Sequence, residues 1–173
     1  MMMGKRANGL VSVAFAGLVA ALVASSIRQP LLLHGMTAVG SERKNLVTVP
    51  LDAGMEAVVA LDHVTAELTG YVLDRFTGKF FIQYRYNVAK DFPIRPGKQP
   101  RFLMVSGLAD FRQFSSNERL ADGVVYVSEE NSGQVVAYGI PWNTQFRAST
   151  TGSQQLQFLP LDYAKTRFTN IRD

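Results

Sequence analysis

Residues 56–88 read EAVVALDHVTAELTGYVLDRFTGKFFIQYRYNV, and this stretch decides the fold. Two similar turns, at 62–68 and 74–80, each carry an acid, two residues, Thr, a small residue, a charged residue and an apolar residue. Asp and Thr side chains close turns by bonding nearby backbone amides. The segment between the turns is too short for an ordinary helix and is rich in Val, Tyr and Thr, while 81–88 alternates apolar and polar side chains. The stretch therefore predicts three consecutive strands.

A second stretch resembles the first hairpin. Residues 123–140 read GVVYVSEENSGQVVAYGI; 58–61 match 124–127, and 65–71 match 132–138 after one inserted turn residue. Repetition of a two-stranded unit predicts repeated hairpins in one sheet. The alternative is that any two hairpins with similar turns look alike, and the sequence leaves both interpretations open.

The turn pattern resembles the hairpin turns in blade repeats of quinoprotein-like β-propellers. The resemblance covers three short stretches, at 62–68, 74–80 and 129–135. A full propeller of four-stranded blades needs a longer domain than this one. The resemblance therefore implies shared turn chemistry and not membership of that family.

The N-terminus has the features of an export segment. Lys5 and Arg6 precede an uncharged run over 7–27, and a basic start followed by an apolar run is typical of a secretory signal. The run also approaches the roughly 20 residues that span a bilayer. We expect residues 1–27 to be either a signal peptide, cleaved after Ser25 or Ser26, or a retained signal-anchor helix, which is the preferred interpretation. The basic residues then stay in the cytoplasm and the rest of the chain lies outside.

Within that run, Ala16, Ala20 and Ala24 recur four residues apart. Small residues at this spacing let transmembrane helices approach closely, so these three are candidate helix-packing residues. The alternative is that signal segments are simply rich in Ala.

Charge is unevenly distributed along the chain. The net charge is +4, and the residues before Asn45 account for all of it, so the part from Asn45 onward is neutral. The basic pI therefore reflects orientation at the membrane and not a nucleic-acid surface. We expect a linker over 28–45 and a single extracytoplasmic β-rich domain over 46–173.

Few residues qualify as a functional site. Lys98 and Arg101 lie in a proline-rich basic loop that could meet an acidic ligand, although a solvated loop is the simpler interpretation. Trp142, the single Trp, follows a predicted strand and could stack on a sugar or a peptide. The alternative is that its ring closes the end of a sheet.

No catalytic or metal-binding set of residues is evident. The chain contains no Cys, and of its two His residues His34 lies in the expected linker and His63 in a predicted turn. We expect no metal, no cofactor and no nucleic-acid partner. Carboxylates at Asp110, Glu129 and Glu130 leave a small exported hydrolase open, although the adjacent pair in a turn is expected to face solvent.

Two segments have helical spacing. Apolar residues in 107–122 predict one or two short helices, and Leu161, Ala164, Phe168 and Ile171 share one face of a predicted C-terminal helix. The expected fold is mainly β, with α+β as an alternative. It is an antiparallel sheet of repeated hairpins (a β-meander) of about eight strands, with two or three short helices, behind the signal-anchor.

These features together predict an anchored or exported envelope protein that acts as a non-enzymatic binding or assembly component. Its partners would be the membrane, through the N-terminal segment, and another protein or further copies of itself. The alternatives are a small hydrolase that uses carboxylates and a soluble module that binds a ligand or glycan around Trp142.

Overall fold

The computed structural model describes residues 38–94, 96–111, 119–143 and 154–166. The chain divides into two units, Met1–His34 and Gly35–Asp173, and every described residue belongs to the second. Ala16, Ala20 and Ala24 lie outside the described residues, as does the expected signal-anchor helix. Within the described ranges no helix has the length and apolar character needed to span a bilayer.

The first sheet has six strands, and five of them follow one another along the chain. Its order is β1 (Ala38–Gly40), β2 (Lys44–Pro50), β3 (Glu56–Asp62), β4 (Glu67–Leu73), β5 (Phe80–Asn87) and β9 (Gln154–Leu156). Neighbours from β1 to β5 are antiparallel, and β9 joins β5 in parallel. The first five strands therefore form a meander.

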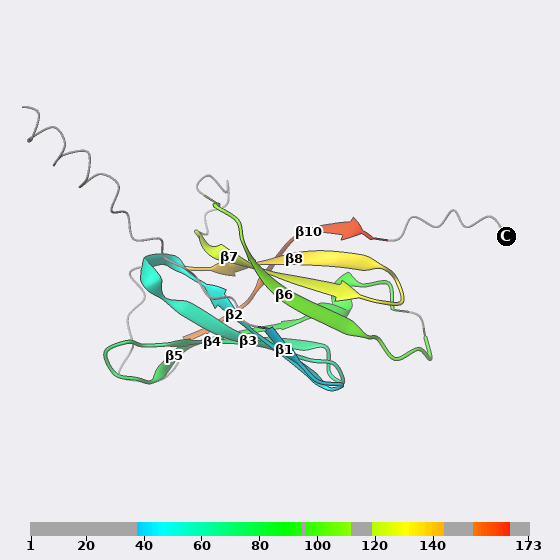
Figure 1. The fold of residues 1–173 in the computed structure, drawn as a ribbon, viewed down its shortest axis with the longest axis horizontal. Coiled ribbons are helices and arrows are strands. Elements are labelled where there is room, and N and C mark those ends of the chain that lie inside the picture. The colour runs from blue at the N-terminus through cyan, green and yellow to red at the C-terminus, as the bar shows by residue number, and fades with distance from the viewer. Residues whose placement is uncertain (1–37, 95, 112–118, 144–153, 167–173) are drawn as a thin grey trace, which may run out of the picture. The chain divides into compact units, whose positions relative to one another are not determined.

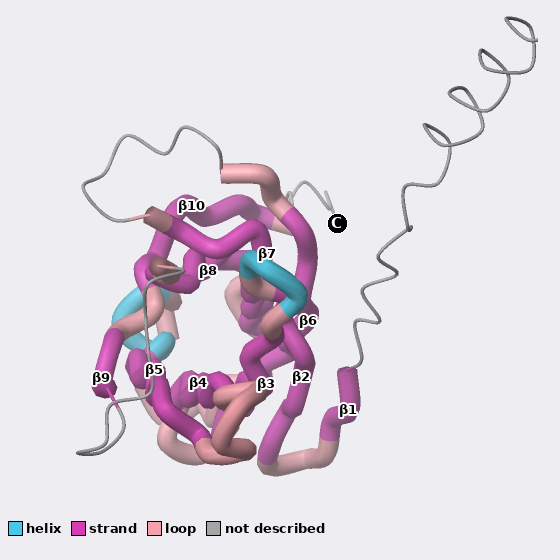
Figure 2. The backbone as a smooth tube through the Cα atoms, turned by 90° about the vertical axis from the view of Figure 1, so that its left-hand side faces the viewer, coloured by secondary structure: helices cyan, strands magenta, loops and turns pink. Residues whose placement is uncertain are grey.

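The second sheet has four strands, all antiparallel to their neighbours. Its order is β10 (Leu159–Lys165), β8 (Gln134–Pro141), β7 (Leu120–Glu129) and β6 (Phe102–Leu108). The two sheets face each other: β3, β4 and β5 lie on one side and β7, β8 and β10 on the other (Figure 1, Figure 2). The β3–β4 and β7–β8 hairpins, which are similar in sequence, belong to different sheets.

The core lies between the sheets, because alternate residues of each strand point inward. On β3 and β4 the buried positions occur at every second residue, which is the period of a strand with one face covered. Each sheet has one apolar face, and burying both against each other removes them from water together. The shared core includes Val47, Val59, Leu61, Leu68, Ile82 and Tyr84 from the first sheet and Phe102, Val125, Val127, Tyr138 and Ile140 from the second.

The prediction of a mainly β fold with antiparallel pairing is confirmed, but several of its details differ from the structure. The strands form two sheets and not one. The ends of the segment 107–122, expected to be helical, are strands: β6 reaches Leu108 and β7 begins at Leu120. Its centre, 112–118, lies outside the described residues, and a short helix there stays a prediction. The expected C-terminal helix begins as β10, because its backbone pairs with β8 from Leu159 to Lys165; Phe168 and Ile171 are not among the described residues.

The helical turns among the described residues are two short 3-10 segments, η1 (Asp52–Gly54) and η2 (Val88–Asp91). At the N-terminal side, β1 and the first residues of β2 lie inside the stretch expected to be a linker. The first sheet therefore starts at Ala38, earlier than the expected domain boundary at 46.

Candidate binding site at the β7–β8 turn

Three hairpin turns are closed by an acidic side chain. Asp62 Oδ1 accepts two amides of the β3–β4 turn at 2.9 and 3.1 Å, and Asp74 Oδ1 accepts two amides of the β4–β5 turn at 2.7 and 3.4 Å. Glu129 does the same for the β7–β8 turn. The sequence prediction that Asp62 and Asp74 close their turns is confirmed.

The same pattern places one residue of each turn in the left-handed region. The residue four positions after each acid has positive φ: 55° at Ala66, 65° at Gly78 and 64° at Gly133. Glycine adopts this conformation without strain, whereas alanine does so at a cost. The shared turn geometry explains why the two hairpins resemble each other in sequence although they lie in different sheets.

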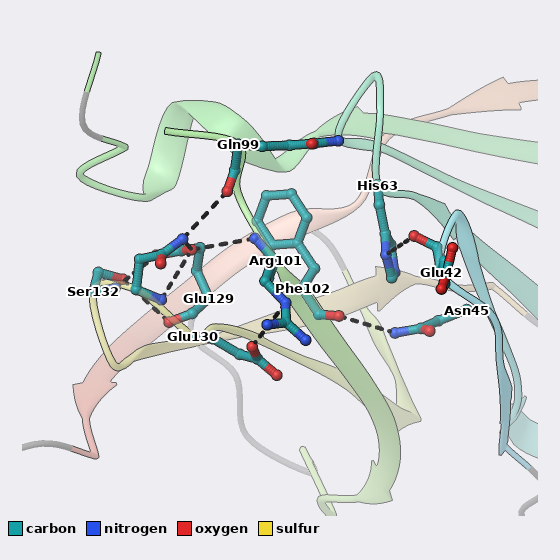
Figure 3. Close-up of polar contacts among 10 residues, drawn as sticks. Glu42, Asn45, His63, Gln99, Arg101, Phe102, Glu129, Glu130 and Ser132 are labelled. Atoms are coloured by element: carbon teal, nitrogen blue, oxygen red, sulfur yellow. Dashed lines mark hydrogen bonds and ion pairs between the residues drawn. The ribbon is translucent and has the colours of Figure 1, made fainter. Parts of the chain in front are cut away.

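Glu129 is the turn acid with the most contacts. Its Oε2 accepts the amide of Ser132 at 2.7 Å, and its Oε1 accepts the amide and the side-chain Nδ2 of Asn131 at 3.1 and 2.8 Å. Oε1 also accepts the amide of Arg101, at the start of β6, at 3.3 Å (Figure 3). One carboxylate thus holds together the β7–β8 turn and the loop that leads into β6.

These donors decide the charge state of Glu129. Burial by itself would raise the pKa of Glu129, but the amides of Ser132, Asn131 and Arg101 donate to the carboxylate and hold its pKa below the usual range. The side chain is 1% exposed, which contradicts the expectation that Glu129 faces solvent. A buried carboxylate that already accepts four hydrogen bonds is poorly placed to exchange protons with a substrate.

A pocket of about 630 Å³ opens beside this turn. Three segments line it: the basic loop, the β7–β8 turn and the end of β10. Its lining residues are Pro93, Ile94, Lys98, Arg101, Glu129, Glu130, Asn131, Ser132, Gln134 and Lys165.

The pocket carries three cations. Arg101 Nε pairs with Glu130 Oε2 at 3.1 Å (Figure 3). Lys98 and Lys165 have no ion pair with any residue in the described part of the chain. The lining holds three cations and two carboxylates, Glu129 and Glu130, so its formal net charge is +1, and neither lysine is paired with a carboxylate of the described residues. Such a surface attracts carboxylates or phosphates.

A smaller hollow of about 190 Å³ adjoins the pocket and shares Gln134 with it. Gln134 Nε2 donates to the backbone oxygen of Asp91 at 2.8 Å, so η2 is tied to the start of β8. The remaining lining residues are Asp91, Val136, Pro160, Leu161, Asp162 and Tyr163. The two hollows extend along the side of β10.

The structure brings together some of the residues selected from the sequence and separates others. Lys98 and Arg101 both line the pocket, whereas Trp142 is 3% exposed and belongs to the core. A buried ring has no free face for a sugar, and the placement agrees with the alternative that Trp142 closes the end of a sheet. Asp110 does not line the pocket, so it does not join Glu129 and Glu130 in one site.

Neither the place of Lys165 in the pocket nor the buried position of Glu129 follows from the local sequence. Lys165 was taken for part of a helix, and it reaches the pocket only because β10 pairs with β8 as a strand. The turn pattern did carry a signal for Glu129, because it occupies the same position as Asp62 and Asp74. The described residues contain no group of three or more potential metal ligands, and His63 stands apart, with Nδ1 against the backbone oxygen of Glu42 at 3.2 Å (Figure 3).

Comparison with family models, with curated proteins and with solved structures gives no match for this chain.

Proposed function

We propose that this chain is a non-enzymatic binding and assembly component of the cell envelope, and that the pocket at the β7–β8 turn takes an acidic segment of its protein partner. The observation that carries the proposal is that Lys98 and Lys165, two lysines without a carboxylate partner among the described residues, line one pocket. The anchored, extracytoplasmic location is part of the proposal and rests on the basic and apolar N-terminal sequence.

A peptide fits this pocket better than a compact small molecule does. Small-molecule sites are lined mainly by apolar side chains with a few polar groups. Here Pro93 and Ile94 are the apolar lining residues, and the other lining residues are charged or carry amide or hydroxyl groups. A charged groove of this kind is suited to an extended acidic segment that lies across several donors.

The arrangement of the carboxylates supports binding over hydrolysis. Hydrolysis by a carboxylate pair needs one acid that can give up a proton and one base that can take it. Glu129 has a lowered pKa and four donors, and Glu130 pairs with Arg101. Both carboxylates thus already have partners within the protein.

The test compares two variants of the full chain with the same change in charge. In the pocket variant, Lys98→Gln is combined with Lys165→Gln; in the control, Arg75→Gln is combined with Lys79→Gln in the β4–β5 turn, which lies at the other end of the strands (Figure 1). Binding of a fluorescein-labelled hexaglutamate peptide is measured by polarisation in mild detergent. We expect the pocket variant to bind at least about tenfold more weakly, and the control to bind like wild type, with affinity falling as salt rises.

Equal affinity of the pocket variant and wild type for the peptide would overturn the assignment of the pocket. A second measurement addresses assembly: the mass of the full chain extracted from membranes in mild detergent. We expect a complex larger than the monomer that the pocket variant weakens. A chain that runs as a monomer and crosslinks to no other protein would overturn the assembly role.

A further inference from the structure

The β4–β5 turn presents a cluster of exposed apolar side chains at the end of the first sheet that is opposite the pocket. Phe76, at the tip, is 84% exposed, and Leu73 and Phe80, which face each other across the hairpin, are 48% and 55% exposed. Single exposed apolar residues are common on protein surfaces, but three in one turn form a patch that needs an explanation. Figure 1 shows this hairpin projecting at the end of β4 and β5.

The turn is held in a defined shape. Asp74 is buried and its backbone and side chain close the turn: its amide donates to Lys79 O at 2.8 Å, its carbonyl accepts from Gly78 N at 2.8 Å, and Oδ1 accepts the amide of Phe76. The Phe80 ring also lies 5.6 Å from the Tyr71 ring. The aromatic side chains are therefore presented on a preorganised hairpin, which lowers the entropy lost when the tip binds.

The charges around the tip have one sign. The Arg75 guanidinium lies 5.0 Å from the centre of the Phe76 ring, and Lys79 directly precedes Phe80. Asp74 is the one acid between Leu73 and Phe80, and its carboxylate is turned toward the amides of the turn. The exposed surface of the tip thus combines aromatic rings with two cations.

We propose that the β4–β5 turn inserts Phe76 and Phe80 into the headgroup region of an anionic bilayer, with Arg75 and Lys79 on the lipid phosphates. Aromatic side chains are favoured at the boundary between the headgroups and the acyl chains, and neighbouring cations are favoured beside anionic lipid phosphates. A protein partner is less well matched, because stable protein interfaces take about 20–30 residues on each side and this tip offers one turn. The contact is separate from the N-terminal segment and from the pocket.

The absence of cysteine in the chain makes a direct depth measurement simple. Thr77 and Thr65 occupy the same position in the β4–β5 and β3–β4 turns, and both amides are bound by the acid of their turn. Thr77→Cys and Thr65→Cys, each labelled with a polarity-sensitive dye, therefore form a matched pair at opposite ends of the same sheet. The labelled full chain is reconstituted into vesicles of phosphatidylcholine, with or without phosphatidylglycerol, that also carry nitroxide lipids.

We expect nitroxide lipids to quench the dye at position 77 in anionic vesicles and to leave the dye at position 65 unchanged. Adding Arg75→Gln or Lys79→Gln is expected to lower the equilibrium constant for insertion of the tip by about fivefold for each cation removed. Phe76→Ser is expected to weaken insertion as well, with the thermal unfolding midpoint showing that the fold is retained. The Lys98→Gln and Lys165→Gln variant is expected to insert like wild type, so failure of this proposal and failure of the pocket proposal are distinguishable.

Three outcomes would overturn the proposal. Equal access of an aqueous quencher to both dyes in anionic vesicles would place the tip in water. Equal lipid quenching at position 77 in neutral and anionic vesicles would remove the role of Arg75 and Lys79. Shielding of the dye at position 77 before any vesicle is added would mean that a protein surface, from a second copy or from this chain, covers the tip instead.

Discussion

Tyr138 of β8 donates its hydroxyl to Asp91 Oδ2 at 2.8 Å. The other oxygen of the same carboxylate accepts the hydroxyl of Tyr86, from β5, at 3.1 Å, and the two rings lie 5.6 Å apart. Tyr86 belongs to the first sheet and Tyr138 to the second, while Asp91 ends η2 between them. One carboxylate therefore ties the two sheets together next to the smaller hollow beside the pocket.

Removing the Tyr138 hydroxyl should lower stability and reveal the energetic coupling between Tyr138 and Asp91. Tyr138→Phe leaves Asp91 with one donor fewer in a partly buried site, and we expect a loss of about 1–3 kcal/mol in the free energy of unfolding. Asp91→Asn should cost less in the Tyr138→Phe background than in wild type, because the shared hydrogen bond is already gone. Urea unfolding of the two single variants and the double variant measures the difference; strictly additive costs would contradict the coupling.

The same tyrosine should make the fold sensitive to alkaline pH. Burial, and then the hydrogen bond to Asp91 and its charge, raise the pKa of Tyr138 well above the ordinary value of 10.0. The unfolded chain ionises at the ordinary pKa while the folded chain keeps the neutral phenol, so stability is full below that value and is lost as pH rises above it. We expect Tyr138→Phe to flatten this decline, as measured by urea midpoints across a pH series. An unchanged slope would show that Tyr138 ionises as easily in the folded chain.

Glu129 should contribute to the loss of stability in acid. Its pKa in the folded chain is below the usual 4.5, so its contribution is full above that value and is lost as pH falls through the lowered pKa. We expect Glu129→Gln to be less stable than wild type near neutral pH by about 1–3 kcal/mol, because Gln cannot accept at both terminal atoms. The difference in the free energy of unfolding should narrow in acid, because the carboxylate of wild type becomes protonated there while the Gln side chain does not change. A gap that stays constant with pH would contradict this role, and Glu130→Gln is the matched control at the neighbouring position.

Gly123 should tolerate no side chain. A Cβ at this position of β7 would overlap the backbone oxygen of Pro50 in β2, so the two sheets would have to move apart. A Cβ at Gly70 meets the far end of the Phe158 side chain at 2.8 Å, and a side chain can shift more easily than the paired backbone of Pro50. We expect Gly123→Ala to cost about 3 kcal/mol or more and Gly70→Ala clearly less, as measured by thermal and urea unfolding. Equal costs would mean that the contact between β7 and β2 is loose.

The turns could be predicted from the sequence because their chemistry is local. Asp62 and Asp74 bind amides two and three residues ahead, so the donors and the acceptor lie within one short stretch of chain. The alternation of β3, β4 and β5 is local in the same way, since side chains of a strand point to opposite faces in turn. The acid, the Thr or Ser and the small residue occur together at three hairpin turns of this chain, β3–β4, β4–β5 and β7–β8.

The prediction of a C-terminal helix is wrong over 161–165, where a tertiary contact outweighs the local pattern. The spacing of Leu161 and Ala164 suits a helix, but the edge of β8 offers backbone partners along the length of β10, and pairing there satisfies the amides that a helix would satisfy internally. The run of four apolar residues at 102–105 is covered on one face only: β6 buries Phe102 and Met104 and exposes Leu103 and Val105. Which side chains of such a strand are buried depends on the face that another sheet covers, and the sequence of the strand does not show which face that is.

The sequence by itself determined the mainly β composition, the positions of the hairpin turns and the residues that close them, because each depends on groups a few residues apart. The tertiary structure alone decided that the hairpins form two facing sheets, that Trp142 lies in the core, and that Glu129 is buried. It also assembled the pocket: Lys98, Glu129 and Lys165 are distant along the chain and meet only because β6, β7, β8 and β10 pair side by side. The physical reason is that strand pairing is a long-range interaction, and the sheet into which a strand is drawn depends on the faces and edges that the rest of the chain leaves open.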